Sequence, residues 1–330
     1  MDNLNRREFL GAAAGTAALP ILAKSPHAKP KIPLRTLGKT GIKVSILGMG
    51  GGSQFLNATK NDDEVIELIN TAIDGGITYF DCAYGYANGE SLRRYGLVLG
   101  ARRKEVVLTS KTAQRGRDGA LREFEISLKN LKTDHLDVMQ IHDIKPDEDV
   151  EKILSKDGVY RALLELREQK VIKAVGITGH ASALRLRELI DRMDSIDTLL
   201  CPVNPQRDSR HYIPAHEAEN RQGHFKEDLL PVAHKRGMGV IAMKTTAQGQ
   251  LIGTGAGKSD VATLIRFAMS EPNVSVAIVG PGGLANMKAN LITAQNFKPM
   301  SSAERKSVVA SMTLRERVFG YERAGYRDMG

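Results

Sequence analysis

The sequence predicts an α/β protein in which strand–helix units close into a parallel barrel, the (β/α)8 or TIM barrel. Between residues 34 and 296, short apolar runs alternate with amphipathic helical segments about eight times. The runs are apolar throughout, as expected of parallel strands that are covered on both faces. No segment rich in Pro, Gly or Ser divides this region, so a single domain is expected. At 330 residues the chain is long enough to bury a large core.

An N-terminal β-hairpin and a C-terminal helical extension are expected at the two ends of the barrel. Residues 34–45 contain two short alternating segments around Gly38 to Gly41, which is typical of a hairpin. From about residue 297 a tail follows, with a final helix expected around 303–318 and then an aromatic, charged end. Whether this tail covers the barrel mouth, lies outside the barrel or serves a partner stays open.

The strands and helices of the barrel follow from the apolar pattern. In the helix expected at 62–74, Val65, Ile69 and Ile73 form one apolar stripe. Asn61 or Asp62 is the expected cap, and the glycines at 75 and 76 end the helix. Further helices are expected at 90–99 and 121–131, before 169, from 182, from 226, from 260, and through 290. The strands are expected at 44–47, 77–80, 106–110, 136–141, 174–178, 198–203, 239–243 and 274–280.

The composition is that of a globular protein and restricts its function only weakly. The formal charge of +9 and the pI near 9.4 permit an anionic ligand, yet basic and acidic residues are interspersed. A solvated surface is therefore the default interpretation, and no nucleic-acid partner is expected. Cys82 and Cys201 lie far apart without metal or redox spacing, so both are expected to be packing residues.

Polar residues stand at or just after three successive strand ends, where the active face of a parallel barrel lies. They are Asp81, Tyr86, Lys111 and His142. Each one alone has a structural interpretation: a turn or cap residue, an exposed aromatic, a solvated lysine at a strand end, and a histidine whose hydrogen bonds are satisfied. Because neighbouring barrel strands end close together, the joint placement of the four predicts a catalytic site.

At this point the sequence resembles the aldo-keto reductases, from about residue 34 to residue 290. The stretch FDCAYGYANGES at 80–91 is similar to the family segment that carries an aspartate and a tyrosine. VVLTSK at 106–111 resembles the strand that carries the lysine, and EFEISLKNLKTDHLDVMQIHD at 123–143 resembles the segment that leads to the histidine. The resemblance implies that Asp81, Tyr86, Lys111 and His142 form the catalytic tetrad.

The chemistry that these groups suit is hydride transfer between a nicotinamide, NADP(H) or NAD(H), and a carbonyl group. As hydride reaches the carbonyl carbon, negative charge builds on oxygen and a donor must supply a proton. Tyr86 is the expected donor. Its ordinary pKa of about 10 is too high for an acid near neutrality, and a lysine cation nearby lowers it. Asp81 is expected to orient Lys111, and His142 to orient the carbonyl.

The cofactor contacts are expected around the barrel mouth. GMGGGS at 48–53 lacks the spacing of a Rossmann fingerprint and is read as a glycine-rich strand exit. The resemblance implies that Gly50 and Gly51 lie against the nicotinamide and its phosphates, and that Thr178 and Asn204 contact the carboxamide. It also places Lys244 at the start of the pyrophosphate loop. Gly280 and Asn290 bound the segment that meets the adenosine phosphate.

The sequence departs from the family pattern in three places. Thr178 and Gly179 replace the usual serine and asparagine pair, and Leu200 stands where the family usually has a glutamine. The basic residues that often hold the ribose 2'-phosphate are replaced by Gly282, Gly283 and Asn286, with Lys288 nearby. The preference between NADPH and NADH therefore stays open, as do the substrate and the oligomeric state.

Two other functions stay open beside the reductase. One is a nicotinamide-binding module that senses redox state or serves as a partner subunit with little turnover. The other is a metal-dependent hydrolase, suggested by three histidines of the loop at 205–225. These are His211, His216 and His224. They lack helical ligand spacing, so no metal site is expected.

The N-terminus resembles a twin-arginine export signal. Arg6 and Arg7 precede an apolar run rich in Ala and Gly from Leu10 to Ala23, and a polar spacer follows. The first 28 residues are therefore expected to be a signal and spacer for the twin-arginine export machinery, with residues 29–330 forming the reductase-like barrel. The mature protein is expected in the periplasm, without a stable membrane span. An uncleaved anchor or a cytoplasmic location is the alternative.

Overall fold

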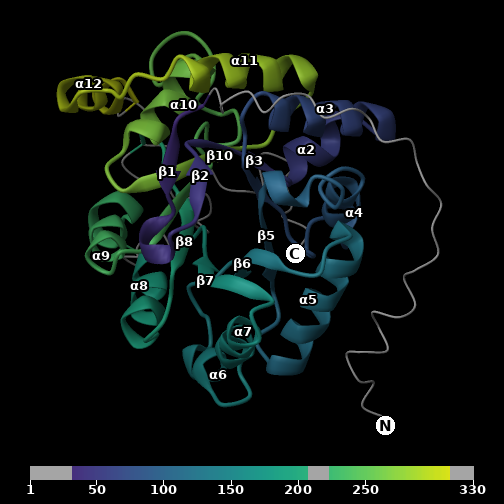
Figure 1. The fold of residues 1–330 in the computed structure, drawn as a ribbon. Coiled ribbons are helices and arrows are strands. Elements are labelled where there is room, and N and C mark those ends of the chain that lie inside the picture. Colours follow the sequence, from purple (N-terminus) through teal and green to yellow (C-terminus); the bar gives the residue numbers. More distant parts are fainter. Residues whose placement is uncertain (1–31, 207–222, 313–330) are drawn as a thin grey trace.

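The structure, a computed structural model, describes residues 32–206 and 223–312. Its centre is a closed barrel of parallel strands in which consecutive strands are neighbours, and helices surround this barrel (Figure 1). The predicted (β/α)8 fold is confirmed. The barrel strands are β3 (Leu47–Gly50), β4 (Tyr79–Asp81), β5 (Val107–Thr112), β6 (Leu136–Ile141), β7 (Ile172–Thr178), β8 (Thr198–Pro202), β9 (Gly239–Met243) and β10 (Val274–Val279).

The helices follow the strands in the expected alternation. They are α2 (Ser53–Ala58), α3 (Asp62–Asp74), α4 (Glu90–Gly96), α5 (Arg117–Leu131), α6 (Val150–Leu154), α7 (Val159–Glu168), α8 (Ala183–Arg192), the π-helix η3 (Phe225–Leu229), α9 (Leu230–Lys235), α10 (Val261–Ser270), α11 (Leu284–Gln295) and α12 (Ser302–Met312). A short 3-10 turn, η2 (Arg103–Glu105), precedes β5. Helix α12 lies within the expected extension. The predicted signal at 1–28 and the end of the chain after 312 lie outside the described residues.

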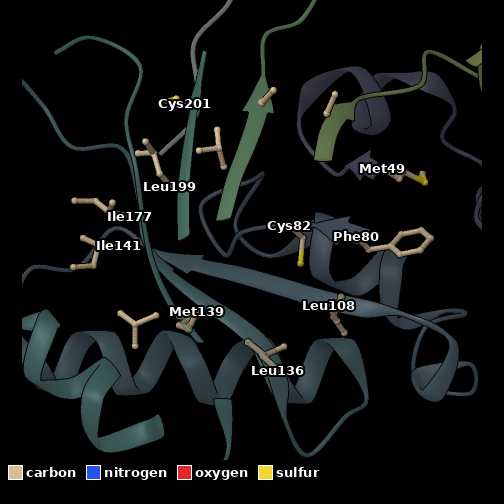
Figure 2. Close-up of a cluster of buried hydrophobic side chains, with 14 of the residues drawn as sticks. Met49, Phe80, Cys82, Leu108, Leu136, Met139, Ile141, Ile177, Leu199 and Cys201 are labelled. Carbon is tan, nitrogen blue, oxygen red and sulfur yellow. The ribbon is translucent and has the colours of Figure 1, made fainter. Parts of the chain in front are cut away.

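The side chains of the barrel strands alternate between its interior and its outer layer, as the period of two requires. Tyr79, Val107 and Val138 belong to the inner cluster. Their neighbours Phe80, Leu108 and Met139 belong to the larger outer cluster, and Figure 2 shows Leu108 and Met139 pointing from the strands toward a helix. Both faces of the sheet are thus buried against apolar side chains, which explains why the strand sequences are apolar throughout.

The N-terminal hairpin is also present. Strands β1 (Leu34–Thr36) and β2 (Lys43–Ser45) pair antiparallel around a 3-10 turn, η1 (Gly38–Thr40). The hairpin packs against the amino-terminal end of β9, where Lys39 N–H donates to the carbonyl of Gly237. At Gly38 φ is +54°, and a Cβ there would lie 2.2 Å from Gly239 N. Only glycine permits this close approach.

Several strand boundaries differ from those expected by one to three residues, and two of these differences follow directly from the strand pairing. The first barrel strand begins at Leu47, because Val44 and Ser45 belong to the hairpin. Strand β5 extends to Thr112, because its ladder with β6 continues to the pair Thr112–Ile141. Lys111 therefore lies inside the strand and not directly after it.

Among the described residues, no helix combines the length and the apolar character needed to cross a membrane.

Candidate active site

The Lys111 ammonium connects the residues predicted at the strand ends. It donates to Asp81 Oδ2 at 2.6 Å, to the carbonyl of Cys82 at 2.9 Å and to the Tyr86 hydroxyl at 3.2 Å. An ammonium carries three hydrogens, and each has an acceptor here. Lys111 and Asp81 are both 1% exposed. The cation is therefore buried, and its partners hold it next to Tyr86.

The strand register explains why Lys111 reaches Asp81 from inside β5. Asp81 of β4 pairs in register with Thr109 of β5, and Lys111 pairs with Gln140 of β6. The period of two then directs Asp81, Thr109, Lys111 and Gln140 to the same interior face. Asp81 Oδ1 accepts from Thr109 Oγ1 at 3.1 Å and from Gln140 Nε2 at 3.5 Å.

Thr109 and Gln140 were missed by the sequence prediction. Thr109 lies in β5, two residues before Lys111. Gln140 lies in β6, two residues before His142. Counting by two along each strand would have placed them beside the aspartate.

His142 lies next to Tyr86. Their ring centroids are 5.5 Å apart with the planes at 81°, an edge-to-face arrangement. His142 directly follows β6, and its backbone N–H donates to the Thr112 carbonyl at 2.8 Å. The structure therefore brings all four predicted residues, Asp81, Tyr86, Lys111 and His142, to the carboxyl ends of β4, β5 and β6.

The two cysteines are packing residues, as predicted. Both are buried and free. Burial raises the pKa of each thiol, so neither is a thiolate near neutrality. Cys82 Sγ donates to the Thr109 carbonyl.

A pocket of about 370 Å³ opens beside this group. Asp81 and Tyr86 form part of its wall, together with most of the residues predicted to contact the cofactor. The predicted residues in the wall are Gly50, Lys244, Gly280 and Asn290. Leu200 and Met243 add apolar surface. The pocket therefore joins the tyrosine to the carboxyl ends of β8, β9 and β10.

The other predicted cofactor contacts lie behind this wall. Gly51 donates its N–H to the Asp81 carbonyl at 2.6 Å, and a Cβ there would lie 2.5 Å from Ser91 Oγ. Thr178 Oγ1 accepts from the Asp143 N–H, and Asn204 Nδ2 donates to the Lys244 carbonyl. These three residues shape the site from within the protein.

His180 is a further residue of the pocket wall that the sequence did not single out. Its Nε2 lies 3.8 Å from Asp143 Oδ1. Burial alone would raise the pKa of Asp143, but the positive charge of His180 and Lys145 lowers it below the ordinary value. Asp143 has a φ of 52° and directly follows His142. The signal for His180 was its place two residues after the end of β7.

The described residues offer no support for a metal-dependent hydrolase. Within 32–206 and 223–312, no group of three or more His, Cys, Asp or Glu side chains is placed to hold a metal ion. His224 lies next to the π-helix, where its N–H donates to Asp228. His211 and His216 lie outside the described residues.

The barrel thus presents, at the carboxyl ends of its strands, a tyrosine beside a buried lysine cation, an arrangement suited to a proton donor. The sequence profile of the aldo/keto reductase family matches residues 47–264, about two thirds of the chain. The chain belongs to the aldo/keto reductase family, which confirms the resemblance seen in the sequence.

Individual relatives agree with this assignment. L-galactose dehydrogenase of Arabidopsis thaliana is 24% identical over 300 residues, which cover 79% of this chain and 88% of that enzyme. A Schizosaccharomyces pombe protein named as a voltage-gated potassium channel beta subunit is 29% identical over 242 residues. That match covers 69% of this chain and 66% of the relative, just under two thirds of its length.

A solved structure shows the same fold. The aldo-keto reductase from Klebsiella pneumoniae in complex with NADPH has a TM-score of 0.66 and 19% identity. The likeness covers 86% of this chain and 96% of that protein.

Proposed function

We propose that the protein is an NAD(P)H-dependent oxidoreductase that reduces an aldehyde or ketone to an alcohol, or catalyses the reverse reaction. The observation that carries the proposal is the Lys111 ammonium held between Asp81 and Tyr86, at 2.6 Å and 3.2 Å. A fixed cation at this distance stabilises negative charge that develops on the Tyr86 oxygen. Tyr86 is therefore the group best placed to donate a proton to the substrate.

The pocket fits a nicotinamide dinucleotide. Gly50 and Gly280 line the pocket at the ends of β3 and β10, where neither adds a side chain that would narrow it. Lys244 provides a cation for a diphosphate, and Asn290 a buried amide. When bound, the nicotinamide supplies or accepts the hydride. A protein of the same fold is described with NADPH.

Four side chains of the protein are proposed to carry out the proton transfer and to orient the substrate. Tyr86 donates its proton to the carbonyl oxygen as negative charge develops there. Lys111 stabilises the tyrosinate that results, and Asp81 keeps Lys111 charged and oriented. His142, edge-to-face with the Tyr86 ring, offers a second hydrogen bond that orients the substrate oxygen. In the direction of alcohol oxidation the tyrosinate accepts the proton.

Two measurements on the purified protein test this function. Quenching or enhancement of nicotinamide fluorescence measures binding of NADPH and NADH separately, and consumption of the reduced form with a panel of aldehydes and ketones measures turnover. The proposal predicts both binding and turnover. If the protein binds neither NADPH nor NADH, the proposal is wrong.

The alternative is a nicotinamide-binding partner or redox-sensing module, which the relative named as a channel beta subunit favours. The paired Asp81, Lys111 and Tyr86 favour the enzyme, because a module without turnover has no need of a tuned proton donor. Tight cofactor binding without turnover of any carbonyl compound tested would favour the module.

The export of the protein is a separate proposal that rests on the sequence of its N-terminus. Residues 1–28 act as a twin-arginine signal and spacer, and the mature barrel is released to the periplasm. This route carries proteins already folded, so the cofactor would travel within its pocket. Substituting Arg6→Lys and Arg7→Lys together should abolish export, which cell fractionation measures. The N-terminal sequence of the exported protein would identify the cleavage site, expected after Ala23 or Ala28.

A further inference from the structure

A partly buried lysine outside the predicted site is linked to the wall of the pocket. Lys226 lies in the π-helix η3 (Phe225–Leu229), and π-helical turns are frequent at functional sites. Its ammonium donates to the backbone carbonyl of Asn204 at 2.9 Å and lies 5.5 Å from the centre of the Phe267 ring. The end of β8 is thereby tied to the helix that leads into β9.

The surroundings of Lys226 disfavour the charged form of its side chain. Burial lowers the pKa of the Lys226 ammonium, which the negative charge of Glu271 and Glu227 partly offsets. Burial likewise raises the pKa of Glu271. A methionine would fill a similar volume beside Phe267 without this desolvation cost. The hydrogen bond to Asn204 is the contact that methionine cannot provide.

Asn204 carries the link onward to the pocket. Its side-chain Nδ2 donates to the Lys244 carbonyl at 3.1 Å, and its Oδ1 accepts from the Gln206 N–H at 3.0 Å. The Lys244 carbonyl also accepts from the Ala247 N–H at 2.8 Å. Both ends of the Asn204 amide are therefore engaged by backbone groups.

The turn at Lys244 needs such support. Lys244 has a φ of 54°, a left-handed conformation that is costly for a residue with a Cβ. This conformation directs the chain from β9 into a segment whose first residues line the pocket. They are Lys244, Thr245 and Thr246. The position of these groups thus depends on a carbonyl that Asn204 holds.

We propose that Lys226 is a positioning residue that acts through Asn204 to fix the Lys244 turn and so preorganises the wall against which the dinucleotide binds. The proposal rests on the function proposed above and adds a residue that does not touch the pocket. A preorganised wall binds a ligand more tightly because less conformational freedom is lost on binding.

The test compares three variants with the intact protein. In Lys226→Met the Kd of the preferred dinucleotide should rise about five- to tenfold, the effect of losing one charge-assisted hydrogen bond that is only partly coupled to binding. Lys226→Arg keeps a charged donor and should recover part of the affinity. Lys235→Met, which changes an exposed lysine of α9, should leave the Kd unchanged. The rate at saturating cofactor and substrate should change little in all three.

Two further readouts separate positioning from general stability. Hydrogen exchange at the amides of residues 244–249 should accelerate in cofactor-free Lys226→Met, while exchange in β5 and β6 stays as in the intact protein. Asn204→Ala should raise the Kd as well, and combining it with Lys226→Met should add little, because both act through one link. Should Lys226→Met not fold, Asn204→Ala and Lys226→Arg provide the same two readouts.

The measurements distinguish a failure of the role proposed for Lys226 from a failure of the reductase function proposed above. If the intact protein binds neither NADPH nor NADH, the function proposed above is wrong, whereas the exchange measurement still tests the link. If the intact protein binds a dinucleotide and Lys226→Met shows the same Kd and the same exchange at 244–249, the role of Lys226 is wrong. Fully additive effects of the two substitutions also contradict it.

Discussion

The Lys111 ammonium lies 3.2 Å from the phenolic oxygen of Tyr86 and 4.6 Å from the centre of its ring. It approaches the tyrosine from within a strand whose position the barrel ladder fixes on both sides. A cation on a solvated loop would move with its side chain and be screened by water. Inside the barrel the distance between cation and phenol is set by the fold.

Tyr86→Phe should lower the rate of carbonyl reduction by about two to four orders of magnitude, since the proton donor is lost. Binding of the nicotinamide dinucleotide should be retained. Steady-state kinetics and fluorescence titration measure the two effects. Tyr84→Phe, at a half-buried tyrosine two residues away, is the matched control and should keep its rate. Full activity in Tyr86→Phe would show that another group donates the proton.

Lys111→Met should reduce both stability and rate. It leaves the Asp81 carboxylate buried without its cation, which costs about 3–5 kcal/mol of unfolding free energy. Combining it with Asp81→Asn removes the uncompensated charge and should restore part of this free energy, as denaturant unfolding measures. The rate should stay low in the double variant. Recovered activity there would mean that Lys111 serves the structure and not the chemistry.

Asn286→Arg should shift the cofactor preference toward NADPH. Asn286 lies in the first turn of α11 and lines the pocket, where an arginine would add a charged fork for a ribose phosphate. We expect the ratio of the Kd of NADH to that of NADPH to rise about tenfold, as for one added charge-assisted contact. Asn296→Arg adds the same charge at the far end of the helix and should not change the ratio. An unchanged ratio in Asn286→Arg would place the adenosine end elsewhere.

Acid should destabilise the protein through Asp137 at the amino-terminal face of the barrel. Burial would raise the pKa of this carboxyl, but Arg103, Lys173 and the Leu108 N–H together lower it below its ordinary value. Because the folded-state pKa is depressed, the stabilisation is present above the unfolded pKa of about 3.9 and is lost as the pH falls through the folded value.

Asp137→Asn tests this effect. The substitution should lower the free energy of unfolding by about 1–3 kcal/mol near neutrality. Below about pH 4, the free energy of unfolding should then depend less steeply on pH than in the intact protein. Urea unfolding at a series of pH values measures both. Asp157→Asn, at an exposed aspartate, is the control and should leave the pH dependence unchanged. A pH dependence unchanged in Asp137→Asn would assign the acid sensitivity to other carboxyls.

The sequence predicted the barrel because its strands and helices differ in period and its strands are covered on both faces. The same pattern placed Asp81, Tyr86, Lys111 and His142 at one end of the barrel. It did not place Thr109 and Gln140 on Asp81, because that contact depends on which residues of adjacent strands are in register. It also did not reveal His180 or Lys226, because their partners are distant in the chain.

The sequence by itself determined the fold class, the family and the residue types of the site, since these follow from local periodicity and from short motifs. Only the tertiary structure decided how the site is assembled. Lys111 reaches Asp81 and Tyr86 because the ladders of β4, β5 and β6 set its height in the barrel. Asn204, expected at the cofactor, donates its Nδ2 to the Lys244 carbonyl, a contact that the sequence did not indicate. Hydrogen-bond geometry depends on distances of tenths of an ångström between residues far apart in sequence, and a linear pattern does not contain those distances.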